Sequence, residues 1–235
     1  MAINVHLLVI GQSGERTSTI LALSLLSLAS QFPADQANFV VLDPHGSEPD
    51  PNSVFHRLAA LLPHEIKIGG PAEVADLMTG LHQDLTGRSA DAGRNAPETF
   101  LLVHEIQRFK ALRPEDEFRF SMDDEESAAS PSKVFSDILG EGAPSGIHVL
   151  ASVDTWNNVS RWIPRKMLSE FEMRVLFQMS ANDSANLIDS PAATQLGLHR
   201  ALFYNEHLGT LETFRPYAMP EDAWFEETLG GRVPT

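Results

Sequence analysis

The 235-residue chain contains no cysteine, which excludes disulfide bonds, thiolate metal sites and a cysteine nucleophile. It also has no apolar run long enough to cross a bilayer, since the longest, residues 20–29, is interrupted by Ser24 and Ser27. No signal-peptide pattern precedes the first predicted strand. These absences predict a protein of a reducing compartment, in the cytoplasm, that makes no membrane contact of its own.

Positive charge is scarce. The sequence has 17 Lys and Arg residues against 32 Asp and Glu residues, which gives a formal net charge of −15. The basic residues stand singly or in pairs such as Arg165-Lys166, and no basic run occurs. A surface this negative repels nucleic acid unless cations gather on one face or in partner subunits. We therefore expect contact with DNA only through an assembly.

The order of apolar patterns predicts an α/β fold with a mainly parallel sheet flanked by helices. Short apolar runs at 5–10, 39–42, 100–103, 146–151 and 174–179 predict strands, and periodic patterns at 18–30, 53–62, 71–85 and 131–139 predict helices. Two late runs, 200–204 and 209–214, predict an antiparallel hairpin. No repeat or linker divides the chain, so one domain over residues 1–235 is expected.

Three further segments have weaker patterns. The acidic stretch 113–130 is typical of a solvated excursion from the domain. The region from Trp156 to Trp162 is predicted to be a loop whose tryptophans pack against the body of the protein, although an aromatic and arginine cluster could also stack on bases. In the C-terminal tail, 218–235, a helix beginning near Trp224 is expected to dock on the core or on a partner.

The segment between the first strand and the first helix has the position of a phosphate-binding loop. In such loops, glycines allow backbone N–H groups to approach a phosphate, a lysine neutralises it and a hydroxyl binds Mg²⁺, in the pattern G-x-x-x-x-G-K-[ST]. Here the eight positions are Gly11, Gln12, Ser13, Gly14, Glu15, Arg16, Thr17 and Ser18. The first glycine and the final hydroxyl match, but arginine replaces the second glycine and threonine replaces the lysine.

The two replacements weaken the predicted site for ATP and Mg²⁺. Arg16 lacks the conformational freedom of glycine, and without the lysine a triphosphate loses its nearest cation while Glu15 adds a like charge. If ATP binds, all eight residues would surround it, with Ser18 towards Mg²⁺. The alternative is a structural turn that binds no ligand.

A second candidate lies at the end of the strand predicted over 100–103, which leads into His104 and Glu105. Nucleotide hydrolases place acids there to hold Mg²⁺ and to orient the attacking water. Glu105 is therefore the candidate catalytic residue, whereas His104 stands where the other acid is expected and is a poor partner for Mg²⁺. A polar strand end without a catalytic role is the alternative.

Taken together, several segments resemble the FtsK/SpoIIIE/HerA group of hexameric RecA-like P-loop motor ATPases. Their order and spacing carry the resemblance over most of the chain. They are the loop 11–18, the strand ends at 42–46 and 101–105, Gly142 to Ala151, Arg174 to Ser180, Asp183-Ser184-Ala185, Leu187-Ile188-Asp189 and Leu196-Gly197. The resemblance implies a RecA-like fold and a homo- or hetero-oligomer, possibly ring-shaped.

The departures from the family pattern concentrate at charged positions. Family members carry Lys where this chain has Thr17, and an acid where it has His104. They carry Arg in place of Ala143 and Ala185, and Gln in place of Asp154. The pattern predicts a degenerate module that binds nucleotide weakly or not at all and serves as a structural or regulatory part of an assembly. Two alternatives remain open: an active ATP-driven DNA translocase whose missing groups come from neighbouring subunits, and a metal-dependent hydrolase that uses Asp43, His45, His104 and Glu105.

Overall fold

The computed structural model describes residues 6–50, 52–91, 96–114 and 129–229, and within them one sheet of eight strands runs in the order β3-β2-β4-β5-β1-β6-β7-β8. Strands β1 to β6 are mutually parallel, while β7 is antiparallel to both β6 and β8. The mainly parallel sheet and its late hairpin confirm the prediction. The strands are β1 (Leu7–Ile10), β2 (Ala37–Leu42), β3 (Glu65–Gly69), β4 (Glu98–Val103), β5 (Ile147–Val153), β6 (Met173–Leu176), β7 (Ala201–Asn205) and β8 (Thr210–Phe214).

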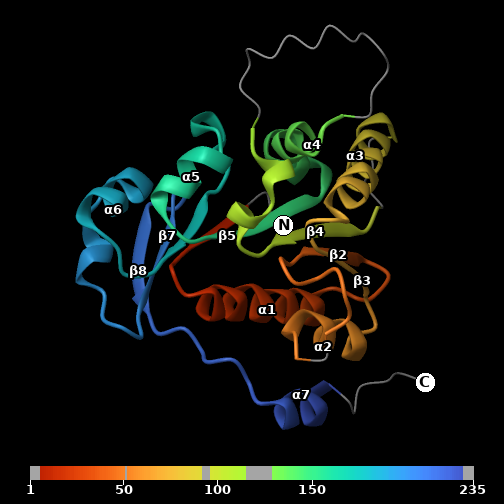
Figure 1. The fold of residues 1–235 in the computed structure, drawn as a ribbon, viewed down its shortest axis with the longest axis horizontal. Helices are drawn as coiled ribbons and strands as arrows, with labels where there is room; N and C mark the ends of the chain where they lie inside the picture. Colours follow the sequence, from red (N-terminus) through yellow and green to blue (C-terminus); the bar gives the residue numbers. More distant parts are fainter. Residues whose placement is uncertain (1–5, 51, 92–95, 115–128, 230–235) are drawn as a thin grey trace, which may run out of the picture.

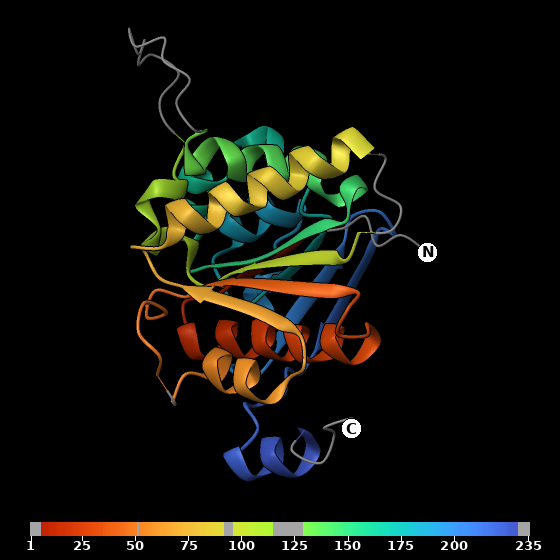
Figure 2. The same ribbon diagram turned by 90° about the vertical axis from the view of Figure 1, so that its right-hand side faces the viewer.

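Helices cover both faces of the sheet (Figures 1 and 2). One face carries α3 (Val74–Asp91), α4 (Pro131–Asp137), α5 (Trp156–Trp162) and α6 (Ala181–Ile188), and the other carries α1 (Gly14–Gln31), α2 (Val54–Leu61) and α7 (Asp222–Leu229). Single turns complete the connections: η1 (Ile106–Arg108), η2 (Lys110–Leu112), η3 (Ile138–Gly142), η4 (Ala143–Ser145), η5 (Arg165–Met167) and η6 (Ala192–Gln195). None of the helices in the described ranges is long and apolar enough to span a bilayer.

The central strands supply both hydrophobic cores because their side chains alternate between the two faces. In β2, Phe39 and Val41 join the core under α1 and α2, whereas Val40 and Leu42 join the core under α3 and α4. Strands β1 and β4 divide in the same way. Burial on both faces explains why these strands read as continuous apolar runs in the sequence.

Three sequence-based expectations about elements were wrong. Strand β3 was missed because it is an edge strand with exposed Glu65 and Lys67, which pair at 3.0 Å. The segment from Trp156 to Trp162 is the helix α5 rather than a loop. Val159 and Trp162 are buried on α5 and lie three residues apart in the sequence. This spacing of apolar residues is typical of a helix and was overlooked. Helix α1 begins at Gly14, four residues before the predicted start. Most of the acidic stretch lies outside the described residues.

His6 links β5 to the turn η3 through both nitrogens of its buried ring. Its Nδ1 accepts a hydrogen bond from the Val149 N–H at 2.9 Å, and its Nε2 donates to the Leu139 carbonyl at 3.2 Å. This arrangement uses the neutral imidazole. Burial is the main reason that the pKa of His6 falls from 6.5 to about 4.

We expect His6 to make the unfolding free energy depend on pH. Between pH 6.5 and 4 the unfolded chain binds a proton that the folded chain refuses, so stability is highest above pH 6.5 and falls as the pH drops towards 4. The loss is about 1.4 kcal/mol per pH unit at most. Urea unfolding of the wild type, His6→Gln and the exposed control His199→Gln measures it. A His6→Gln variant with an unchanged pH slope contradicts the assignment.

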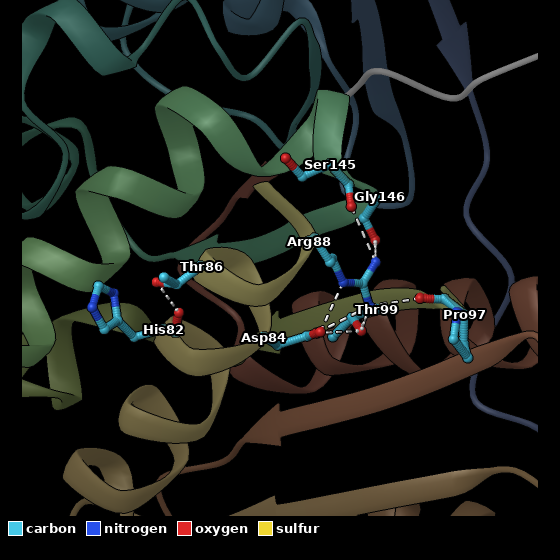
Figure 3. A network of polar contacts seen from close by, with 8 residues as sticks. All are labelled: His82, Asp84, Thr86, Arg88, Pro97, Thr99, Ser145 and Gly146. Carbon is cyan, nitrogen blue, oxygen red and sulfur yellow. Dashed lines mark hydrogen bonds and ion pairs between the residues drawn. The ribbon is translucent and has the colours of Figure 1, made fainter. Parts of the chain in front are cut away.

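The Arg88 guanidinium ties α3 to the starts of β4 and β5 (Figure 3). Its Nε and Nη2 donate to the Asp84 carboxylate at 2.8 and 3.0 Å, and Nη2 also donates to Thr99 Oγ1 at 2.7 Å and to the Pro97 carbonyl. Its Nη1 donates to the carbonyls of Ser145 and Gly146. Every nitrogen of the buried guanidinium makes a hydrogen bond. Arg88 therefore stabilises the amino-terminal ends of β4 and β5, at the opposite end of the strands from the loop 11–18.

We expect Arg88→Met to lower the unfolding free energy by about 3 kcal/mol, since the change leaves three carbonyl groups without their donor and Asp84 with the Thr99 hydroxyl alone. Chemical denaturation at neutral pH measures this loss. Arg200→Met removes an exposed arginine and serves as the control, with an expected change within about 0.5 kcal/mol. Equal stability of the two variants would show that the network contributes nothing.

Candidate functional site

The candidate site lies at the carboxyl edge of the parallel strands, where α/β sheets bind ligands. Strand β1 leads into Gly11, β2 leads into Asp43, and β4 leads into His104 and Glu105. The ring of His104 reaches the start of α1, with its Nε2 donating to the Gly14 carbonyl at 3.3 Å. The topology therefore brings together the predicted loop and the predicted strand ends.

The connection between β1 and α1 is short. It consists of Gly11, Gln12 and Ser13, and Ser13 is already the N-cap, with its hydroxyl accepting the Arg16 N–H at 3.4 Å. The Thr17 N–H donates to the Ser13 carbonyl at 3.1 Å, as in a regular helix. Neither Gly11 nor Gly14 has a positive φ, whereas an anion-binding nest needs alternating right- and left-handed residues.

The side chains of the loop turn to protein groups. The Arg16 guanidinium lies 6.0 Å from the centre of the Phe177 ring, a cation–π contact. The Thr17 hydroxyl donates to the Gly14 carbonyl at 3.1 Å, and the Ser18 hydroxyl donates to the Glu15 carbonyl at 2.9 Å. The Ser18 oxygen keeps lone pairs for a metal ion, but no cationic side chain stands where the lysine is expected.

Gly11 and Gly14 have close neighbours rather than unusual backbone angles. A Cβ on Gly11 would lie 2.5 Å from the Phe177 ring. A Cβ on Gly14 would lie 3.1 Å from the Glu105 carboxylate. The carboxylate therefore sits against the first turn of α1, where the positive end of the helix dipole favours a negative charge.

Glu105 has a left-handed backbone, with φ of 51° and ψ of 61°, which is unusual for a residue other than glycine. The turn is fixed by its N–H, which donates to the Ser152 hydroxyl on β5 at 2.8 Å. Its second carboxylate oxygen lies 3.5 Å from Arg108 Nε. This backbone turn directs the side chain towards α1 and is the kind of strain that is stored at functional sites.

Asp43 is buried beside His104. Burial alone would raise the pKa of Asp43, but the adjacent His104 ring, the His45 N–H at 3.3 Å and the electrostatic effect of both histidines together lower that pKa below its ordinary value. The nearest approach of the two side chains, Asp43 Oδ1 to His104 Nδ1, is 3.6 Å, which is ion-pair rather than hydrogen-bond length. Asp43 is therefore a carboxylate that holds His104 against α1.

The expected metal site is not supported. In the part of the chain that the structure describes, which includes Asp43, His45, His104 and Glu105, no three His, Asp or Glu side chains are arranged to hold a metal ion. His104 instead bridges Asp43 and the Gly14 carbonyl, and Glu105 turns to α1 and Arg108. The described residues therefore give no support to the alternative of a metal-dependent hydrolase.

Sequence reasoning missed three residues of the site. Ser152 fixes Glu105, Phe177 closes over Gly11, and Arg108 contacts the Glu105 carboxylate. The only signal for Ser152 was a polar residue inside the apolar run of β5. Beside the loop lies a hollow of about 350 Å³, whose walls include Glu15, Arg16, Phe177, His199, Arg215 and Tyr217. It is large enough for a small ligand and has two arginines and one histidine against one carboxylate.

Comparison with known proteins gives structural likeness without sequence likeness. No protein-family model matches the sequence, and no curated protein is significantly similar to it. Among solved structures, the conjugation coupling protein TcpA of pCW3, in a monomer form with ATPγS, is 15% identical with a TM-score of 0.68 and is matched over 95% of this chain. The type VII secretion ATPase EccC of Thermomonospora curvata (ATPases 2 and 3, with a signal sequence peptide) is 12% identical with a TM-score of 0.69, over 92%.

The DNA-packaging ATPase B204 of Sulfolobus turreted icosahedral virus is matched along its whole length, with 12% identity, a TM-score of 0.59 and 92% of this chain covered. This chain has the fold of an FtsK/SpoIIIE-type P-loop ATPase domain. It spans 63% of the TcpA chain and 37% of the EccC chain. The FtsK/SpoIIIE-type fold accounts for the strand order and for the position of the loop after β1.

We expect Ser152→Ala to lower the unfolding free energy by about 1–3 kcal/mol, because the Glu105 N–H loses its acceptor while its left-handed backbone remains. Ser160→Ala, which removes an exposed hydroxyl of α5, is the control, with an expected loss below about 0.5 kcal/mol. Denaturant unfolding measures both. If Ser152→Ala costs no more than the control, the hydroxyl does not hold the turn.

Proposed function

We propose that this chain is a degenerate P-loop ATPase-like module that binds nucleotide weakly or not at all and acts as a structural or regulatory part of an assembly. One observation carries the proposal: the place that an anion would take at the start of α1 is bordered by the Glu105 carboxylate, and no lysine is present to offset it. A triphosphate at this point would meet a negative charge and lack its usual cation.

The backbone of the loop supports the same proposal. A phosphate is held by several free N–H groups that converge on it. Here the helix has already begun at Gly14, so that the Thr17 N–H bonds to Ser13, and the Arg16 N–H faces the Ser13 hydroxyl. With three residues between strand and helix, fewer N–H groups are available than in a wide loop. ATP would need both a rebuilt loop and a displaced carboxylate.

The arrangement of related proteins supports a role within an assembly. The structures of EccC and EssC contain ATPases 2 and 3 of one chain, so ATPase-type domains occur side by side in these proteins. This chain covers 37% and 46% of those structures. We infer that it occupies one place in a homo- or hetero-oligomer, such as a ring, and meets DNA only through that assembly.

An active ATP-driven translocase is the second candidate, and the position of Glu105 favours it. Its carboxylate lies at the end of β4, directed at the start of α1, which is where a water-orienting base would stand. In that case Ser18 would hold Mg²⁺, and Arg16 or a neighbouring subunit would supply the missing charge. TcpA and the B204 of a related virus were both solved with ATPγS.

Calorimetric titration with ATP, with and without Mg²⁺, distinguishes the two candidates. We expect no saturable binding by the wild type below about 1 mM, and at least tenfold tighter binding, about 1.4 kcal/mol, by the double variant Arg16→Gly/Thr17→Lys. The double variant leaves the net charge unchanged, whereas Ser27→Lys adds a lysine on the exposed side of α1 away from the loop and serves as the control for an added positive charge. The Ser27→Lys variant should bind like the wild type.

Tight, Mg²⁺-dependent binding by the wild type, with turnover above background and loss of both in Ser18→Ala, would overturn the degenerate module and establish the active enzyme. If the double variant folds normally and still fails to bind, the missing lysine is not the deficit. Glu105→Gln in that background then tests whether the carboxylate is responsible.

A further inference from the structure

Six exposed cations gather on two segments that contact each other. They are Arg108, Lys110 and Arg113 on the turns η1 and η2, and Arg161, Arg165 and Lys166 at the end of α5 and on η5. In the sequence they stand about 50 residues apart and read as scattered charges. We call this set the basic surface. It contains more than a third of the 17 Lys and Arg residues of the chain.

The two segments are fixed to one another by buried contacts. The Trp162 indole N–H donates to the Phe109 carbonyl at 3.1 Å, and the Arg113 guanidinium lies 5.7 Å from the centre of the Trp162 ring. Phe109, Leu112 and Trp162 are all buried in the core under α3 and α4. The cations are therefore presented by a rigid base rather than by independent loops, which lowers the entropy lost on binding.

Within the described ranges, the basic surface has little internal neutralisation. Neither segment, 106–114 or 155–169, contains an Asp or a Glu. Among the described residues, the one ion pair made by any of the six is that of Arg108 with Glu105, at 3.5 Å. Outside the two segments the chain has 11 Lys and Arg residues and all 32 Asp and Glu residues, Glu105 among them. A cationic surface in so acidic a protein is a departure from its general charge, and exposed charges of one sign attract partners of the other.

We propose that the basic surface binds a short acidic polypeptide segment of a partner protein. Four of the six cations are arginines, whose planar guanidinium groups bind carboxylates through two parallel hydrogen bonds. A long nucleic acid would extend beyond the surface and meet the excess of carboxylates that covers the rest of the chain, whereas a segment of a few Asp and Glu residues matches the surface alone. This interaction is independent of nucleotide binding at the loop 11–18.

The test measures binding of a fluorescein-labelled decapeptide of alternating Asp and Glu residues by fluorescence anisotropy at low salt. We expect saturable binding of the acidic peptide, with an affinity that falls as salt is added. The same peptide with Asn in place of Asp and Gln in place of Glu should not bind. The variant Arg161→Glu/Lys166→Glu should lose at least about tenfold in affinity. Lys67→Glu/Arg200→Glu, an equal charge change on β3 and before β7, should change the affinity by less than about twofold, and thermal unfolding confirms that both variants are folded.

Three results would overturn the proposal. The first is the absence of binding by the acidic peptide, and the second is equal loss in the two double variants, which would reduce the effect to net charge. In the third, a short DNA duplex binds more tightly than the peptide at the same salt and is released by Arg161→Glu/Lys166→Glu. That result would assign the basic surface to nucleic acid instead. None of these outcomes depends on whether the chain binds ATP.

Discussion

The contact of the Glu105 carboxylate with the first turn of α1 is the constraint on which the candidate site depends. A left-handed residue at the end of β4, fixed by Ser152, directs the carboxylate to Gly14 and makes a larger side chain there difficult. The same turn places His104 between Asp43 and the Gly14 carbonyl. The start of α1 is thus bound to two strand ends by the protein's own polar groups, and a phosphate would have to compete with them.

The stability of the FtsK/SpoIIIE-type fold comes from residues outside the candidate site. The two hydrophobic cores are supplied by alternating side chains of β1, β2 and β4, which do not involve the loop. The Arg88 network closes the opposite edge of the sheet. Arg16 and Thr17 therefore affect the electrostatics at the start of α1, while the two cores are packed by other residues.

Much of the architecture was predictable because strands buried on both faces are continuous apolar runs. β1, β2, β4 and β5 were located from such runs, and the hairpin of β7 and β8 from its spacing. The edge strand β3 escaped prediction because a strand with one solvated side mixes Lys and Glu with its apolar residues. The start of α1 was placed too late, because the glycines at 11 and 14 indicate a wide loop, whereas they actually accommodate Phe177 and Glu105.

The sequence by itself determined the fold class, the candidate loop and its missing lysine, because these depend on local pattern and residue type. Only the tertiary structure decided where the charges act. It directed Arg16 to Phe177, brought Glu105 to α1, placed His104 between Asp43 and the Gly14 carbonyl, and joined the two segments that carry the six cations through Trp162. Electrostatic interactions depend on the distance between groups in space, and residues 50 positions apart in the chain acquire that distance only when the sheet and its helices are packed.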